Sequence, residues 1–88
     1  MKIIKRNGTE VQFDELKITA AIEKANKEVV ETERLSEEDI DNITNNVKYQ
    51  CQKMNRALSV EEIQNLVEDE IMKLNAFSVA RKYNYISL

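Results

Sequence analysis

Three basic residues near the N-terminus have the side-chain types and the spacing to bind an anion. Lys5 and Arg6 directly precede Asn7-Gly8, the dipeptide most typical of a tight hairpin turn, because both positions tolerate a positive φ angle. Lys17 follows Asp14 by three residues, in the predicted first turn of a helix. A helix N-terminus leaves backbone N–H groups unpaired and carries the positive end of the helix dipole. The pattern therefore predicts that three cations gather into a phosphate site.

The hairpin also predicts which side chains share a face. A two-residue turn at Asn7-Gly8 would pair Ile4 with Val11, and alternate pairs lie on the same side of the ribbon. The apolar side would then consist of Ile4, Val11 and Phe13. Ile3 and Lys5 would point the other way. On that side Lys5 could form an ion pair with Glu10 across the strands. The alternative to a phosphate site is therefore a hairpin whose basic side chains are solvated or paired in this way.

Apolar residues recur at helical spacing along the rest of the chain and predict four helices. The predicted elements are a hairpin over about 2–13 and helices over about 15–29, 37–53, 60–74 and 76–87. Three of the helices begin with one signal, a polar N-cap followed four residues later by isoleucine, and these N-caps are Asp14, Ser36 and Ser59. The chain has no proline and one glycine, which favours helices over long irregular loops. The predicted fold is mainly α, of the α+β class: one domain over residues 1–88, with a four-helix bundle capped by an N-terminal β-hairpin.

The apolar stripes of the helices predict a mostly aliphatic core. Its predicted members are Ile18, Ala21, Ile22, Ala25, Val29, Ile40, Ile43, Val47, Cys51, Ile63, Leu66, Val67, Ile71, Leu74, Phe77, Ala80, Tyr83, and Ile86 or Leu88. Cys51 is predicted to be a small buried hydrophobic residue rather than a reactive thiol. The acidic run 68–70 is predicted to face solvent, because consecutive helical residues point about 100° apart and cannot converge on one metal ion.

Charge and composition argue against several functions. The net charge is −3, and it divides into +2 for residues 1–27, −8 for 28–70 and +3 for 71–88. The acidic middle segment would repel a phosphate backbone, so no direct nucleic-acid binding is expected. The absence of histidine and of a glycine-rich phosphate loop argues against catalysis, and a single cysteine argues against a structural zinc site. No signal peptide or long apolar run is present, so we expect a cytoplasmic protein without a membrane partner.

Several short segments share a pattern with one protein family. They are Lys5-Arg6-Asn7-Gly8, Phe13-Asp14, Lys17-Ile18, Ala21-Ile22, Ser59-Val60-Glu61-Glu62-Ile63-Gln64-Asn65-Leu66-Val67-Glu68 and Val79-Ala80-Arg81-Lys82-Tyr83. Together they resemble the ATP-cone domain, an N-terminal allosteric domain of many ribonucleotide reductases. The resemblance implies a third strand near Ala57-Leu58, and hence a small three-stranded mixed sheet over the bundle. The first two motifs are also similar to those of the anaerobic class, which predicts a ribonucleoside-triphosphate reductase as the parent enzyme.

The resemblance implies a nucleotide site between the sheet and the bundle. Carried over to this sequence, its residues are Ile3, Ile4, Lys5, Arg6, Asp14, Lys17, Val60 and Gln64. Lys5 and Arg6 would contact the triphosphate, and Lys17 the phosphates or the ribose. Asp14 would face the adenosine part, and the two isoleucines would contact the base. Val60 and Gln64 would line the same pocket.

The function that the resemblance implies is regulatory rather than catalytic. The domain would bind ATP or dATP, with Mg²⁺, and would control the overall activity of the parent reductase through nucleotide-dependent contacts with its catalytic domain and between subunits, including nucleotide-dependent oligomerisation. One alternative is a degenerate cone that acts as a helical protein-interaction module, because Val11 and Val60 replace a Glu and a Thr of some family members. Another is the nucleotide-sensing module of a reductase-gene repressor. That family has a cysteine-rich zinc ribbon before its cone, which the sequence lacks.

Overall fold

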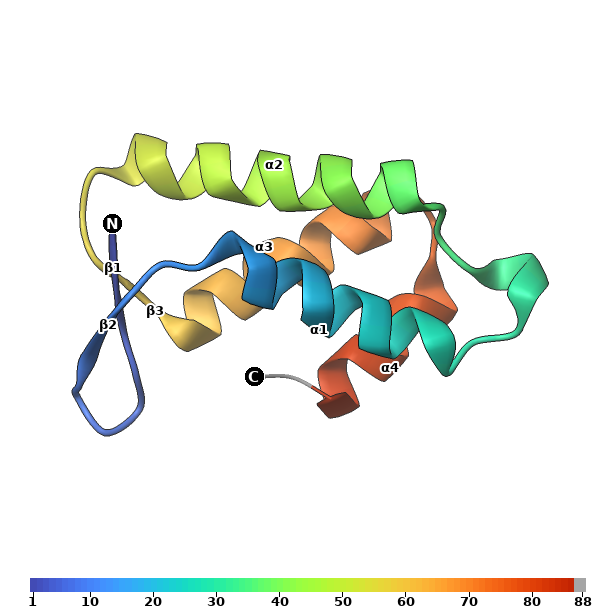
Figure 1. Cartoon of the computed structure of the whole chain (residues 1–88), viewed down its shortest axis with the longest axis horizontal. Helices are drawn as coiled ribbons and strands as arrows, with labels where there is room; N and C mark the ends of the chain where they lie inside the picture. The colour runs from blue at the N-terminus through green and yellow to red at the C-terminus, as the bar shows by residue number, and fades with distance from the viewer. Residues whose placement is uncertain (87–88) are drawn as a thin grey trace.

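The chain folds into four helices with a small sheet at one end (Figure 1). The structure is a computed structural model, and it describes residues 1–86. The elements are β1 (Lys2–Ile4), β2 (Glu10–Gln12), α1 (Glu15–Lys27), the short 3₁₀ helix η1 (Glu31–Glu33), α2 (Glu37–Met54), β3 (Leu58–Ser59), α3 (Val60–Lys73) and α4 (Phe77–Ile86). α1 packs against α2 and α4, and α3 packs against the same two helices. The fold class is therefore as predicted, with the three-stranded form of the sheet.

β1 is the central strand of the sheet. It pairs antiparallel with β2 and parallel with β3, in the order β2-β1-β3. At the hairpin turn, Gly8 N donates to Lys5 O at 2.9 Å and Lys5 N donates to Thr9 O at 2.8 Å, while Gly8 has a φ of +84°. This is a three-residue loop that ends in a left-handed glycine, rather than the predicted two-residue turn. The predicted strand register is therefore wrong by one residue.

Because side chains alternate along a strand, the shift in register moves each side chain of β1 to the opposite face of the hairpin from the one predicted. Ile3, and not Ile4, lies opposite Val11. Ile3 and Phe13 are half-buried and pack against the core, whereas Ile4 is 37% exposed. The prediction that Ile4 belongs to the apolar face is thus incorrect, and Ile3 takes its place.

The helix starts are those that the sequence predicts. Asp14 Oδ1 accepts a 3.0 Å hydrogen bond from Leu16 N at the start of α1. Ser36 and Ser59 each form a complete capping box, in which the serine hydroxyl and an acidic residue three positions later satisfy each other's backbone N–H groups. α2 and α3 end before left-handed asparagines, Asn55 with φ 52° and Asn75 with φ 59°. Such residues stop a helix in the way that glycine usually does.

The core lies between the four helices and beneath the sheet. Its buried apolar members are Ile18, Ile22, Ala25, Val29, Leu35, Ile40, Ile43, Val47, Cys51, Leu58, Ile63, Val67, Ile71, Ala76, Val79, Ala80 and Tyr83. The prediction of Leu74 and Phe77 as core residues is wrong, since they are 47% and 55% exposed. Leu74 follows the last residue of α3. At the start of α4 the buried residue is Ala76, directly before Phe77. The predictions for the Ile86 side chain and for Leu88 fall outside what the structure describes.

The acidic run 68–70 is only partly exposed. Asp69 faces solvent as predicted, but Glu70 is 7% exposed. Glu70 lies seven residues after Ile63 and three after Val67, which places it on the buried stripe of α3. Its carboxylate accepts hydrogen bonds from Asn46, Gln50 and Lys73. The prediction of a fully solvated face is therefore wrong at this residue.

Among residues 1–86, no helix combines the length and the apolar composition that a membrane crossing needs.

The single cysteine, Cys51, is 1% exposed, as predicted. Burial, and then the charge of Glu62, raise the pKa of its thiol, so it stays protonated at neutral pH.

Candidate functional site

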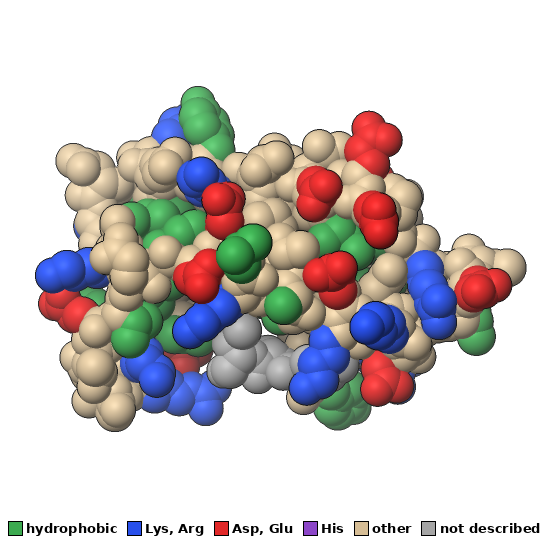
Figure 2. Space-filling model, in the orientation of Figure 1, with side chains coloured by type: hydrophobic (Ala, Val, Ile, Leu, Met, Phe, Trp, Pro, Cys, Tyr) green, Lys and Arg blue, Asp and Glu red, His purple; other side chains and the backbone are tan. Residues whose placement is uncertain are grey.

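The tip of the hairpin lies beside the first turn of α3. β1 pairs with β3 in the register Ile4 to Ser59, and Ser59 is the N-cap of α3. The residues that follow Ile4 are therefore held next to the start of this helix. A pocket of about 260 Å³ lies between them, lined by Lys5, Arg6, Asn7 and Val60. Figure 2 shows Lys and Arg side chains gathered over the hairpin end of the molecule.

Arg6 bridges the hairpin and α3. Its Nε donates a 2.7 Å hydrogen bond to Glu61 Oε1, across 55 residues of sequence. The bond from Arg6, and then one from Glu61's own backbone N–H, lower the pKa of the Glu61 carboxyl. Both partners are therefore charged at neutral pH. The side chains are 76% and 48% exposed, so the pair lies at the surface.

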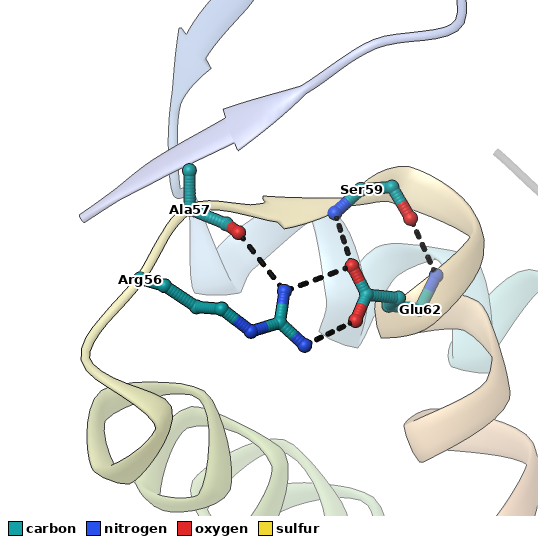
Figure 3. Close-up of polar contacts among 4 residues, drawn as sticks. All are labelled: Arg56, Ala57, Ser59 and Glu62. Atoms are coloured by element: carbon teal, nitrogen blue, oxygen red, sulfur yellow. Dashed lines mark hydrogen bonds and ion pairs between the residues drawn. The ribbon is translucent and has the colours of Figure 1, made fainter.

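The start of α3 is fixed by a second arginine (Figure 3). Arg56 donates two hydrogen bonds to the Glu62 carboxylate, at 3.2 and 2.6 Å, and one to Ala57 O at 3.2 Å. Glu62 Oε1 also accepts from Ser59 N at 3.0 Å, while Ser59 Oγ accepts from Glu62 N at 3.1 Å. The hydrogen bond from Arg56, followed by that from Ser59, lowers the pKa of Glu62 to about 2. The helix terminus beside the pocket is thus tightly held.

Of the eight predicted site residues, the structure brings three to the pocket: Lys5, Arg6 and Val60. Within residues 1–86, Lys5 has no ion pair, so its ammonium group is free to meet an anion. Gln64 lies one turn after Val60, on the same side of α3.

Neither Gln64 nor the other four predicted residues line the pocket. Ile3 lies on the inner face of the sheet and packs against the core, and Ile4 lies on its outer face. Asp14 is the exposed N-cap of α1. Lys17, also exposed, is in the first turn of the same helix. The hairpin and α1 therefore do not gather all three predicted cations at the pocket that the structure forms.

Two residues at this place are absent from the predicted site. Asn7 is apparent in the sequence as a turn residue, and the three-residue loop turns it to the pocket. Glu61 follows Val60 directly, so its position beside the site was open to prediction. Its ion pair with Arg6 was not, because that contact depends on the tertiary placement of the hairpin.

A larger hollow of about 560 Å³ lies between the hairpin and the end of α2. Its lining consists of Met1, Lys2, Glu10, Cys51, Gln52, Asn55, Arg56 and Ala57, and includes none of the predicted site residues. Its two cations are already paired, Lys2 with Glu10 at 3.7 Å and Arg56 with Glu62 at 2.6 Å. Arg6 in the smaller pocket is paired as well, but Lys5 there has no ion pair among residues 1–86, so the smaller pocket is the better candidate for an anion site. Across the described part of the chain, no group of three or more His, Cys, Asp or Glu residues could hold a metal ion.

Comparisons with known proteins bear on the family of the chain. Residues 1–86 match the model of the family described as the ATP cone domain. The chain is 32% identical to the alpha subunit of ribonucleoside-diphosphate reductase from Chlamydia trachomatis serovar D, and 28% identical to that from Chlamydia muridarum. Each match covers 94% of this chain but 9% of the relative, so the chain spans less than a tenth of the length of these relatives. Because the family model covers almost every residue, the chain belongs to the ATP-cone family.

Proposed function

We propose that this domain binds ATP or dATP at the hairpin tip and thereby regulates a ribonucleotide reductase of which it is part. The single observation that carries the proposal is the pocket formed by Lys5, Arg6 and the first turn of α3. It combines an ammonium group that has no ion pair among residues 1–86, a guanidinium group and a helix N-terminus, which are the groups that proteins use for phosphate.

The pocket is matched to the phosphates rather than to a whole nucleotide. Its volume of about 260 Å³ is below the range of about 300–1,000 Å³ that is usual for small-molecule pockets. The adenosine part would therefore extend beyond it, toward Gln64 and the predicted contacts Asp14 and Lys17. Mg²⁺ would be held by phosphate oxygens and water, its preferred ligands at such sites.

The regulatory step that we propose is a population shift. A nucleotide that bridges the sheet and the bundle would stabilise one arrangement of the two, and so change which contacts the domain makes with the catalytic domain or with other subunits. For this to work, the nucleotide has to bind one arrangement more tightly than the other. That the parent enzyme is a ribonucleoside-triphosphate reductase of the anaerobic class stays a prediction. The two relatives named above are, by contrast, ribonucleoside-diphosphate reductases.

A binding titration with matched variants tests the proposal. Purified domain is titrated with ATP, dATP, GTP and ADP by calorimetry, with Lys5→Ala and the control Lys24→Ala, which removes an exposed lysine from the last turn of α1. Loss of a charge-assisted contact should weaken adenine-nucleotide binding by about tenfold or more in Lys5→Ala. Lys24→Ala should bind as the wild type does. Thermal unfolding gives a second readout, since ligand at a hundred times its dissociation constant adds about 2.7 kcal/mol to stability.

A second candidate function is a helical interaction module without a working nucleotide site. It is favoured by Val60, an apolar residue in the wall of the pocket at a position where the family resemblance implies a threonine in some members. If the folded domain binds none of the four nucleotides at millimolar concentration, this second function replaces the first.

If the domain does bind nucleotides, discrimination between ATP and dATP would require a hydrogen bond to the ribose hydroxyl that dATP lacks.

A further inference from the structure

The arginine that faces the pocket is already bound to a carboxylate. Arg6 Nε lies 2.7 Å from Glu61 Oε1, and Glu61 directly follows the pocket residue Val60 on α3. A guanidinium Nε–H that donates to a carboxylate in this way cannot donate to a phosphate oxygen at the same time. The carboxylate of Glu61 thus occupies one N–H donor of Arg6, on an edge of the guanidinium where an anionic ligand could otherwise bind.

We propose that Glu61 is an internal competitor for the phosphates: it occupies Arg6 in the ligand-free domain and is displaced when a nucleotide binds. This inference rests on the proposed function, because it names how that same site is regulated. In the ligand-free state the pair holds the hairpin tip to α3. In the bound state the phosphates take over the same guanidinium, and the hairpin exchanges one anionic partner for another.

The exposure of the pair supports competition over a purely structural role. Arg6 and Glu61 are 76% and 48% exposed, and exposed ion pairs contribute little to stability. The neighbouring pair Arg56–Glu62 is also exposed, at 55% and 41%, but it differs in geometry, since it is bidentate and part of a capping box. The sequence thus places a structural pair and an exchangeable pair side by side at the start of α3.

Competition also sets the threshold for the ligand. A triphosphate carries several negative charges and would displace a single carboxylate, but the displaced Glu61 then remains close to those charges and repels them. The competitor therefore lowers affinity twice, by occupying Arg6 and by like-charge repulsion. A domain with this device responds only to a higher nucleotide concentration than its cations alone would require.

The experiment compares Glu61→Gln with Glu38→Gln. Both glutamates are exposed and each occupies the second position of a helix after a capping-box serine, in α3 and in α2. Each variant changes the net charge by the same amount, and Glu38 has no ion pair within residues 1–86. Titration with ATP and with inorganic tripolyphosphate should show a dissociation constant lowered about three- to tenfold in Glu61→Gln, the size expected from an exposed charge pair plus repulsion. Glu38→Gln should change it by less than about twofold.

A double-mutant cycle with Arg6→Ala completes the test. In that background, Glu61→Gln should gain much less affinity, because the guanidinium for which the carboxylate competes is gone. If the wild type binds ATP and Glu61→Gln binds it no better than Glu38→Gln, competition is refuted while the proposed function stands. Weaker binding in Glu61→Gln would also overturn it, since Glu61 would then be a nucleotide ligand. If neither the wild type nor Glu61→Gln binds ATP or tripolyphosphate, both the competition and the proposed function fail.

Discussion

Asn46 Nδ2 donates a 3.0 Å hydrogen bond to Glu70 Oε1, and this contact joins α2 to α3 through a buried carboxylate. Gln50, one turn further along α2, donates to the other carboxylate oxygen at 3.1 Å, and Lys73 donates to it at 2.8 Å. Burial raises the pKa of Glu70, but the hydrogen bonds from Lys73, Asn46 and Gln50 outweigh it, so the net pKa lies below its ordinary value. Glu70 is therefore charged in the folded domain, with both oxygens partnered.

Replacement of Glu70 by alanine should destabilise the domain. The change removes the shared acceptor of Asn46, Gln50 and Lys73, and because each hydrogen bond contributes about 0.5–1.5 kcal/mol, the total loss should be about 1–3 kcal/mol. Urea unfolding at pH 7 measures the loss, with the neighbouring exposed Asp69→Ala as control. The control should stay within about 0.5 kcal/mol of the wild type. Equal stability of Glu70→Ala and Asp69→Ala would mean that the network joining α2 and α3 contributes nothing.

Acid should weaken the domain through the capping box of α3. Because Glu62 has a folded-state pKa of about 2, lowered from 4.5, it stabilises the folded state at every pH above 4.5. That contribution is lost progressively as the pH falls from 4.5 toward 2. Glu62→Gln keeps the shape of the capping box but carries no charge, so wild type and variant should differ most at neutral pH and converge in acid. Urea unfolding at a series of pH values measures the difference, and a gap that widens in acid would contradict the assignment.

Helix starts could be predicted from sequence because capping is local. Asp14, Ser36 and Ser59 each satisfy backbone groups within three residues of themselves, so their role does not depend on the rest of the fold. The same holds for the apolar stripes of α1 and α2. The spacing of Glu70 from Ile63 and Val67 also follows this local pattern, but its contacts with Asn46 and Gln50 could not be recognised, since these partners lie on another helix.

The hairpin register was not predictable with the same certainty, because Asn7-Gly8 is compatible with more than one turn. Of these two turn residues only Gly8 takes a positive φ, and the loop gains one residue. The candidate site was likewise only partly predictable from the sequence. The basic motif at Lys5 and Arg6 is visible in the sequence, but the position of Lys17 outside the pocket and the pairing of Arg6 with Glu61 depend on tertiary packing.

The two isoleucines of β1 provide a direct test of the register. Ile3 packs against the core and Ile4 is 37% exposed, so Ile3→Ala should cost about 1–2 kcal/mol and Ile4→Ala less than about 0.5 kcal/mol. Both changes remove the same atoms from the same strand, so each serves as the control for the other. Denaturant unfolding measures the two values. The reverse order would restore the two-residue turn and place Ile4 inside.

Tyr83 lies fully buried in the core, and its hydroxyl group has no hydrogen-bond partner among the described residues. Its side chain is 0% exposed. Burial, and then the charge of Glu68, raise the pKa of Tyr83 to about 12. Because an unpaired buried hydroxyl costs about 1–3 kcal/mol, Tyr83→Phe should raise the free energy of unfolding by about 1 kcal/mol.

The control for this substitution is Tyr85→Phe, since Tyr85 is 84% exposed and should change stability by less than about 0.5 kcal/mol. Tyr83→Ala tests the packing role separately and should cost about 3–5 kcal/mol, because it empties the space of a buried ring. Thermal and denaturant unfolding of the three variants distinguish the contributions of ring and hydroxyl. A loss of stability in Tyr83→Phe, with Tyr85→Phe unchanged, would show that the phenol has a hydrogen-bond partner in solution and that the hydroxyl contributes to stability.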